Sequence, residues 1–138
     1  TVYGPGEDKR RFISTVIRQC LQGISPSLTS ESIVRDYIYV DDVVDAYLVA
    51  ISKGEKFSGQ VINISTGKDT ALKDVVGIII KLTHAKVVPN IGSFPRREGE
   101  VLNLVGDSTK SEKLLNWKAK HSLEEGLNKT IKWVKEND

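Results

Sequence analysis

The stretch that decides the fold is VRDYIYVDDVVDAYLVA, from Val34 to Ala50. Its residues from Tyr37 to Val40 are aromatic or β-branched, which is typical of a strand. Apolar residues then recur at helical spacing on one face, so a helix follows the strand at once. These residues are Val43, Val44, Tyr47, Leu48 and Ile51. We expect Asp41 or Asp42 to cap the helix by accepting hydrogen bonds from its first N–H groups. A strand that leads directly into a helix fixes the position of the residues before it, Arg35 among them.

Further helices are predicted on both sides of this stretch by apolar residues three and four positions apart. They span 9–22, 70–83 and 108–115, and a terminal helix begins after Ser122. The terminal helix has the clearest local signal, because Ser122 and Glu125 have the spacing of a capping box.

Short strands are predicted at 61–64, 87–91 and 101–105, and the segment 27–29 is at most a short strand. Pro89 interrupts the second of these, which suits a strand at the edge of a sheet. Strands and helices therefore alternate along the chain, and the predicted fold class is α/β.

The composition suits one globular domain. The chain has 138 residues, of which 39% are hydrophobic and 28% charged, and this length can bury a core. The formal charge is only +2 and the basic residues are scattered among acids, so nucleic-acid binding is not expected. No apolar run is long enough to cross a membrane, and no signal-peptide pattern is present. The single Cys20 cannot form an internal disulfide, so we expect a cytoplasmic location.

The main chemical candidates are arginines. Arg97 lies in the charged loop 95–100, PRREGE, and a guanidinium offers a rigid fork of donors that fits phosphate oxygens. From the residues alone, a double arginine on a loop is more often a solvated surface feature. Arg35 has its own alternative, an internal ion pair with Asp36 or Asp41. Asp36 is interpreted as structural, and no residues are spaced as ligands for a metal.

Five segments, in the same order, resemble the substrate-binding half of extended short-chain dehydrogenases/reductases, the NAD-dependent nucleotide-sugar epimerases and dehydratases. They are TVYGPGED at 1–8, RDYIYVDDVVDA at 35–46, VINISTGKDTALKDVV at 61–76, PRREGEV at 95–101 and DSTKSEKLLNWKAKHSLEEGLNKTIKWV at 107–134. One such motif is a weak signal, but five in the expected order make chance agreement improbable. The chain has no initiator methionine, and we expect it to be a piece of a longer protein.

The resemblance implies that residues 1–138 form a small α+β substrate-binding domain of a UDP-glucose 4-epimerase-like enzyme, with the Rossmann half absent. The complete enzyme would bind NAD or NADP through its N-terminal half. This chain contains no G-x-G-x-x-G motif, and none of its tyrosines has a lysine four residues on, which is the catalytic pair of the family. No catalytic and no cofactor-binding residues are therefore expected here.

The same resemblance implies a substrate site. Arg97 would contact the diphosphate of a nucleotide sugar, and Glu100, where the family usually has aspartate, would contact the ribose. Arg35 would be a second arginine facing the same diphosphate. Thr1 stands where many members have asparagine and some threonine, beside a loop that approaches the substrate.

The expected function is the nucleotide-sugar-binding portion of an epimerase or dehydratase, with the 4-epimerase type favoured. The alternative is a free-standing, non-catalytic binding or assembly module derived from that family. Expected partners are a nucleotide-diphosphate sugar and the Rossmann half of the same protein. A homodimer is also considered, since the family commonly dimerises through helices that lie mainly outside this chain. A third interpretation, a small domain without a ligand, requires Arg35 and Arg97 to lie on different faces.

Overall fold

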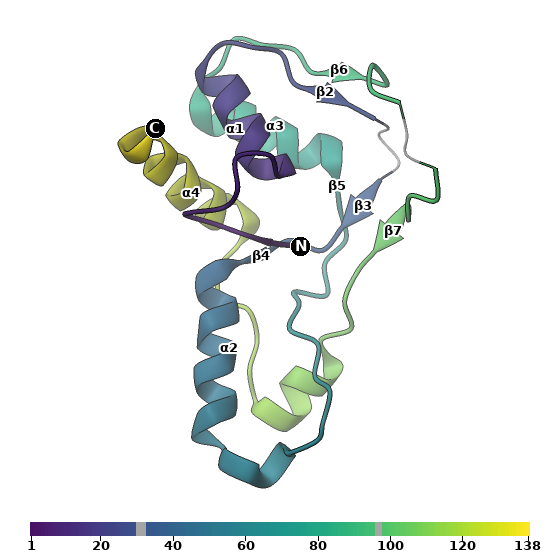
Figure 1. The fold of residues 1–138 in the computed structure, drawn as a ribbon, viewed down its shortest axis with the longest axis vertical. Helices are drawn as coiled ribbons and strands as arrows, with labels where there is room; N and C mark the ends of the chain where they lie inside the picture. Colours follow the sequence, from purple (N-terminus) through teal and green to yellow (C-terminus); the bar gives the residue numbers. More distant parts are fainter. Residues whose placement is uncertain (30–32, 96–97) are drawn as a thin grey trace.

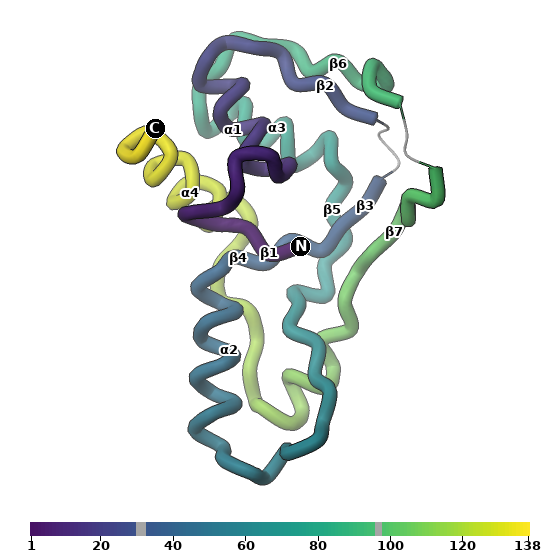
Figure 2. The backbone as a smooth tube through the Cα atoms, viewed as in Figure 1, coloured from purple at the N-terminus to yellow at the C-terminus, as the bar shows by residue number. Residues whose placement is uncertain are grey.

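The computed structural model describes residues 1–29, 33–95 and 98–138 (Figure 1). In these ranges the chain forms four α-helices: α1 (Phe12–Leu21), α2 (Val40–Ser52), α3 (Leu72–Thr83) and α4 (Leu123–Asn137). Helices α1, α3 and α4 pack together at one end, and we call them the three-helix region (Figure 1, Figure 2). Helix α2 runs toward the other end, where it lies near a 3₁₀ turn, η1 (Gly54–Phe57), and a π-helical segment, η2 (Ser111–Leu115). We call α2, η1, the loop 58–69 and η2 the α2 region.

Strands of two residues each form three small sheets in the described ranges. The strands are β1 (Val2–Tyr3), β2 (Ser27–Leu28), β3 (Val34–Arg35), β4 (Ile38–Tyr39), β5 (Thr70–Ala71), β6 (Asn90–Ile91) and β7 (Asn103–Leu104). β1 is parallel to β4, and β2 is parallel to β6. β3 lies between β5, to which it is antiparallel, and β7, to which it is parallel. The α/β class predicted from the sequence is confirmed.

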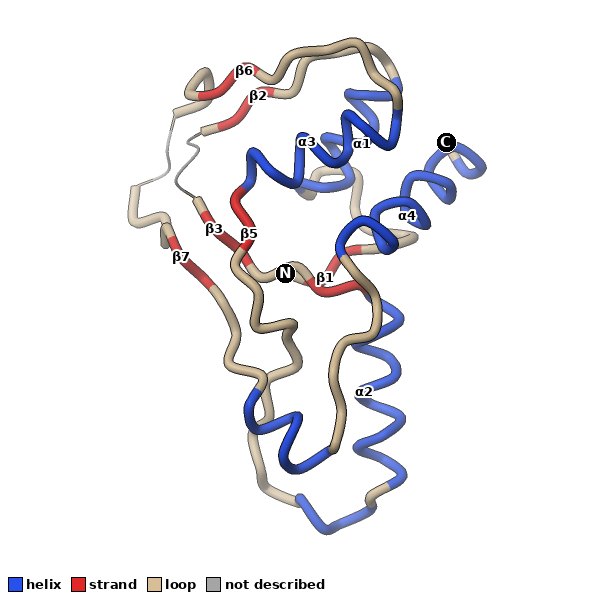
Figure 3. The backbone as a smooth tube through the Cα atoms, turned by 180° about the vertical axis from the view of Figure 1, so that it is seen from behind, coloured by secondary structure: helices blue, strands red, loops and turns tan. Residues whose placement is uncertain are grey.

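The predicted strand at 61–64 differs from the structure, where the whole segment 58–69 between η1 and β5 is a loop (Figure 3). The other predicted strands all contain an observed one. Within the described part of the chain, residues 61–64 make no backbone–backbone hydrogen bond. A strand is defined by pairing with a neighbour, so an extended segment without one is not a strand.

The three-helix region holds the larger of two hydrophobic clusters. Its buried residues include Ile17 and Leu127, both fully buried, and Tyr3, whose ring meets the ring of Tyr39 edge-on at 5.8 Å between centroids. The predicted capping box of α4 is present: Ser122 Oγ accepts from the Glu125 N–H at 3.2 Å, and Glu125 Oε2 accepts from the Ser122 N–H at 2.8 Å. Glycine at 126 is required by packing, because a Cβ there would lie 2.2 Å from the Tyr3 hydroxyl.

The expectation that Asp41 or Asp42 caps α2 is wrong. The residue at the cap position is Tyr39, and no side chain caps the helix. Asp42 is instead 1% exposed and accepts hydrogen bonds from the backbone N–H groups of Lys120 and His121 at 3.1 and 3.0 Å. Its Oδ1 also lies 2.9 Å from His121 Nδ1. The carboxylate thus anchors the segment that leads into α4.

The predicted apolar face of α2 is largely exposed. Val43 packs against the smaller hydrophobic cluster, whose buried members are Ile38, Ala46, Leu115 and Trp117. The other four residues of the face are exposed, namely Val44 (52%), Tyr47 (65%), Leu48 (61%) and Ile51 (73%). We call these four residues the α2 stripe.

Candidate functional site

A pocket of about 510 Å³ opens beside the N-terminus of α1, between this helix, β2 and β3. Its charged lining residues are Glu7, Arg10, Arg11, Arg35 and Glu100. Thr1, Tyr37 and Phe94 also line it. Three of the four residues predicted as substrate-binding, Thr1, Arg35 and Glu100, therefore meet at one pocket. The fourth, Arg97, lies outside the described residues.

Arg35 and Glu100 lie side by side, although they are far apart in the sequence. Arg35 Nη2 is 3.5 Å from Glu100 Oε1, and the two side chains are only 18% and 21% exposed. Arg35 Nη1 also donates to the carbonyl oxygen of Val34 at 2.8 Å. Among the described residues, the ion-pair partner of Arg35 is thus Glu100, and the alternative pairing with Asp36 or Asp41 is not observed. The backbone contact holds the guanidinium at the pocket wall.

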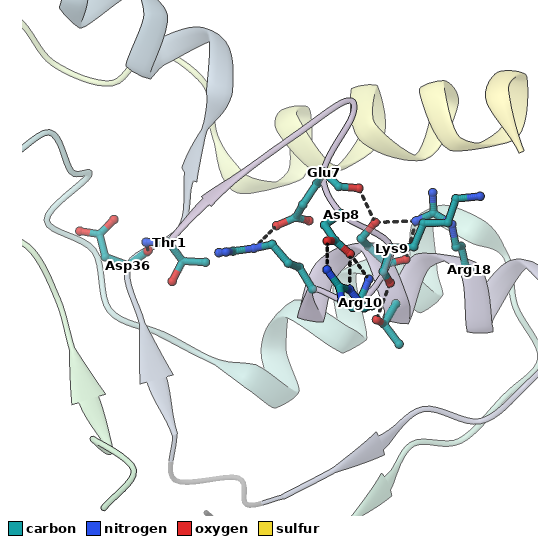
Figure 4. Close-up of polar contacts among 10 residues, drawn as sticks. Thr1, Glu7, Asp8, Lys9, Arg10, Arg18 and Asp36 are labelled. Atoms are coloured by element: carbon teal, nitrogen blue, oxygen red, sulfur yellow. Dashed lines mark hydrogen bonds and ion pairs between the residues drawn. The ribbon is translucent and has the colours of Figure 1, made fainter.

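Asp36 has the structural role expected from the sequence. It is 4% exposed, and its Oδ1 accepts from the Thr66 hydroxyl at 2.7 Å and the Thr66 N–H at 3.1 Å. Its Oδ2 accepts from the N–H groups of Gly67 at 2.9 Å and Gly106 at 3.3 Å. These bonds tie two loops to the chain next to Arg35. Asp36 lies between β3 and β4, beside Thr1 (Figure 4). The bonds fix the wall on which Arg35 stands.

Three further charged residues of the pocket, Glu7, Arg10 and Arg11, were missed by the sequence reasoning. Glu7 Oε1 accepts from Arg11 Nε at 3.1 Å, and the side chains are 8% and 57% exposed. Burial raises the pKa of the Glu7 carboxyl, against the opposing effect of Arg11. The available signal was the spacing of four residues between opposite charges at the start of a predicted helix. That spacing does not reveal that Glu7 is buried.

The tyrosines near the site, Tyr37 and Tyr39, both belong to the core. Tyr37 is 6% exposed and Tyr39 is 3% exposed, and both belong to the larger hydrophobic cluster. Burial raises the pKa of the Tyr37 phenol well above its usual range. Tyr37 therefore stays protonated at neutral pH, as a pocket-wall residue that can donate a hydrogen bond.

The described residues contain no group of three or more His, Cys, Asp or Glu side chains that could hold a metal ion. In the same part of the chain, the helices are all too short or too polar to cross a membrane.

The family profile described as GDP-mannose 4,6 dehydratase matches residues 2–130. CDP-abequose synthase of Salmonella muenchen is 32% identical over 94% of this chain and 44% of its own length. The structure of UDP-glucose 4-epimerase from Thermotoga maritima with UDP-glucose superposes with a TM-score of 0.89, at 34% identity, over 99% of this chain and 44% of that one. MoeE5 in complex with UDP-glucose and NAD gives a TM-score of 0.86 at 30% identity, over 99% of this chain and 45% of that one.

The chain thus spans less than half the length of these relatives. It belongs to the extended short-chain dehydrogenases/reductases, in the family of NAD-dependent nucleotide-sugar epimerases and dehydratases, and it corresponds to their C-terminal part.

Proposed function

We propose that this chain is the nucleotide-sugar-binding portion of an NAD(P)-dependent epimerase or dehydratase, most closely of the sugar-nucleotide 4-epimerase type. The observation that carries the proposal is the pocket beside α1, where Arg35, Glu100 and Thr1 converge. Its volume of about 510 Å³ is in the range of small-molecule sites. A similar structure, the Thermotoga maritima enzyme, holds UDP-glucose.

Each residue has a chemical part in this proposal. Arg35 binds the diphosphate, together with Arg97 from the neighbouring loop, because two guanidinium groups match a ligand that carries two negative charges. Glu100 accepts hydrogen bonds from the ribose hydroxyls. Thr1 supplies a hydroxyl on the side of the pocket next to Asp36. None of these residues transfers a proton or hydride; they bind and orient the substrate.

The cofactor belongs to the rest of the intact protein in this proposal. NAD or NADP, when bound there, would take a hydride from a carbon of the sugar. This chain would hold the nucleotide end of the substrate, so that the sugar reaches the cofactor and a catalytic tyrosine outside the chain.

In this proposal, the cofactor-binding part of the intact protein packs against the α2 stripe and the loop 61–64. The stripe exposes four apolar side chains at helical spacing, and a patch of this kind is typical of an interface. Residues 61–64 have a strand-like sequence, and within the described residues they lack a backbone partner, so an added strand can pair with them. This surface favours a domain of a larger enzyme over the free-standing module. A homodimer formed through parts outside the chain, and a cytoplasmic location, belong to the same proposal.

The test is nucleotide binding by the intact gene product, measured by titration calorimetry with UDP, CDP and GDP in parallel. We expect one of these diphosphates to bind, and Arg35→Ala to weaken it by about tenfold or more, as for a lost hydrogen bond to a charged group. The nucleoside alone, which lacks phosphate, should bind the variant and the parent protein equally. A folded protein that binds none of the three diphosphates would contradict the proposed function.

A further inference from the structure

The segment 116–122, which leads from η2 to α4, runs beside α2 (Figure 1, Figure 3). We call it the connecting segment. Asp45 of α2 accepts from Trp117 Nε1 at 2.9 Å and forms an ion pair with Lys120 Nζ, also at 2.9 Å. Asp42, one turn earlier in α2, accepts from two backbone N–H groups at the other end of the segment. Two carboxylates of α2 therefore fasten the connecting segment to this helix.

His121 is the residue of the connecting segment that contacts both α2 and α4. Its Nδ1 lies 2.9 Å from Asp42 Oδ1, and its Nε2 lies 2.8 Å from Nζ of Lys129, which belongs to α4. The imidazole also lies against the ring of Tyr39, with 4.9 Å between the centroids. The Asp42 side chain is buried, whereas that of His121 is partly exposed, so solvent reaches the imidazole. One ring thus bridges two helices.

The partners of the ring determine where its hydrogen lies. An ammonium group can only donate a hydrogen bond, and a carboxylate oxygen can only accept one. Lys129 Nζ therefore donates to Nε2, which must carry no hydrogen, and Nδ1 carries the hydrogen that it donates to Asp42 Oδ1. This arrangement requires a neutral imidazole that is protonated at Nδ1.

The other charged and titratable groups around the ring are already engaged. Glu125 Oε2, on α4, accepts two hydrogen bonds within the capping box. Lys120, next to the ring in the chain, is paired with Asp45. Burial raises the pKa of the Tyr39 phenol, which therefore stays uncharged at neutral and acidic pH. Histidine is the side chain that ordinarily changes charge between about pH 5 and 8, so His121 is the group here that responds to pH in this range.

We propose that His121 is a pH-dependent link between α2 and α4. The neutral ring connects Lys129 to Asp42 and ties the start of α4 to α2. When Nε2 takes up a proton from solvent, it becomes a donor that faces an ammonium group, and two positive charges at this distance repel each other. Lys129 is then released, while Nδ1 keeps its hydrogen bond to Asp42. This proposal concerns how the α2 region and the three-helix region are joined, and it does not depend on the proposed function.

The test is amide hydrogen exchange of the intact gene product, measured by mass spectrometry in peptides that cover 116–130. Lys129→Met removes the donor and keeps most of the apolar stem. At about pH 8 this variant should exchange about two- to fivefold faster than the parent, as for loss of an exposed charged contact. At about pH 5 it should exchange no faster than the parent, because the ring of the parent is then protonated. The same ratio at both pH values, or no difference at either, would overturn the proposal.

Two further variants serve as controls. Lys132 lies on the same helix, and its Nζ is 4.0 Å from Glu136 Oε1 on an exposed side chain, so Lys132→Met should leave the exchange unchanged at both pH values. His121→Gln removes the ring that titrates. In that background, Lys129→Met should have the same effect at both pH values. A dependence on pH that persisted there would mean that another group is responsible, and it would overturn the role of His121.

The position of the hydrogen is tested without altering the link itself. In the intact protein with ¹⁵N-labelled histidine, the His121 signals are identified by their loss in the His121→Gln variant. At about pH 8, where histidine is ordinarily neutral, we expect a protonated Nδ1 and an unprotonated Nε2. A protonated Nε2 at this pH would overturn the proposal, because that nitrogen could not accept from Lys129.

Discussion

The three-helix region and the α2 region differ in how completely they bury their apolar side chains. Helix α1 buries Ile13, Val16, Ile17 and Cys20, each at most 3% exposed. The α2 stripe, with the same kind of spacing and similar side chains, is between 52% and 73% exposed. Helical periodicity thus identifies an apolar face in both regions, but only one face is covered by described residues of this chain.

The pockets of the two regions show the same contrast. The pocket beside α1 combines arginines, carboxylates and aromatic side chains. The α2 region contains a pocket of about 490 Å³ between α2, η1 and η2, whose lining is mostly apolar and includes Ala46, Phe57, Ile62 and Leu115. The first has the chemistry of a ligand site, and the second is the gap in an incompletely covered core. In the proposed function, the first region therefore carries the substrate site and the second carries the attachment surface.

The largest expected effect is a difference in stability between a variant of the three-helix region and a variant of the α2 region. Ile17→Ala should destabilise chain 1–138 by about 2 to 5 kcal/mol, because the side chain is fully buried. Ile51→Ala, at 73% exposure, should change the stability of the same chain by no more than about 0.5 kcal/mol. Urea unfolding followed by circular dichroism measures both.

The same two substitutions, made in the intact gene product, test whether another part of the protein covers the α2 stripe. If another part of the protein covers the α2 stripe, Ile51→Ala should there cost at least about 1 kcal/mol, since it then removes buried methyl groups. A cost as small as in chain 1–138 would contradict the proposed attachment surface.

The next effect concerns Asp42, which joins the two regions. Asp42→Ala should destabilise the chain by about 1 to 3 kcal/mol, because it leaves the partly buried N–H groups of Lys120 and His121 without their acceptor. The neighbouring Asp41 is exposed, and Asp41→Ala should cost no more than about 0.5 kcal/mol, the usual contribution of an acid in the first turn of a helix. Thermal melting of the two variants gives the comparison. Equal losses would mean that both carboxylates act only through the helix dipole.

These residues also show what the sequence could and could not predict. The capping box of Ser122 and Glu125 was predictable, because both partners lie within one turn of α4. The role of Asp42 was not, because its partners are 78 and 79 residues away. At 61–64 the sequence carries a strand pattern, but no pattern within a segment shows which strand pairs with it.

The residues of the candidate site also fall into two groups, those that the sequence could predict and those that it could not. The resemblance to a known family, based on the order of the motifs, predicted that Arg35, Glu100 and Thr1 belong to one site. The structure places all three at one pocket. Glu7 and Arg11 were missed because their significance depends on tertiary burial. A Glu–Arg pair four residues apart is common on exposed helices, and only the structure shows that this glutamate is 8% exposed.

The smallest expected effect is a pH dependence of the stability of the fold, which comes from Glu7 in the pocket. Burial raises the pKa of Glu7 in the folded protein above its value in the unfolded chain, which is about 4.3 for glutamate. The folded state therefore holds this proton more tightly, so its contribution to stability is full below the unfolded pKa and is lost as the pH rises through the raised pKa.

Glu7→Gln removes this titration. The variant should gain stability over the parent as the pH rises from about 4 to about 7, by less than about 1 kcal/mol, since Arg11 offsets part of the burial effect. Urea unfolding of both proteins across that range measures the difference. A difference that changed in favour of the parent with rising pH would mean that the ion pair with Arg11 outweighs burial. Glu7 would then stabilise the fold through its ion pair with Arg11, and the pocket would carry no stability cost at this residue.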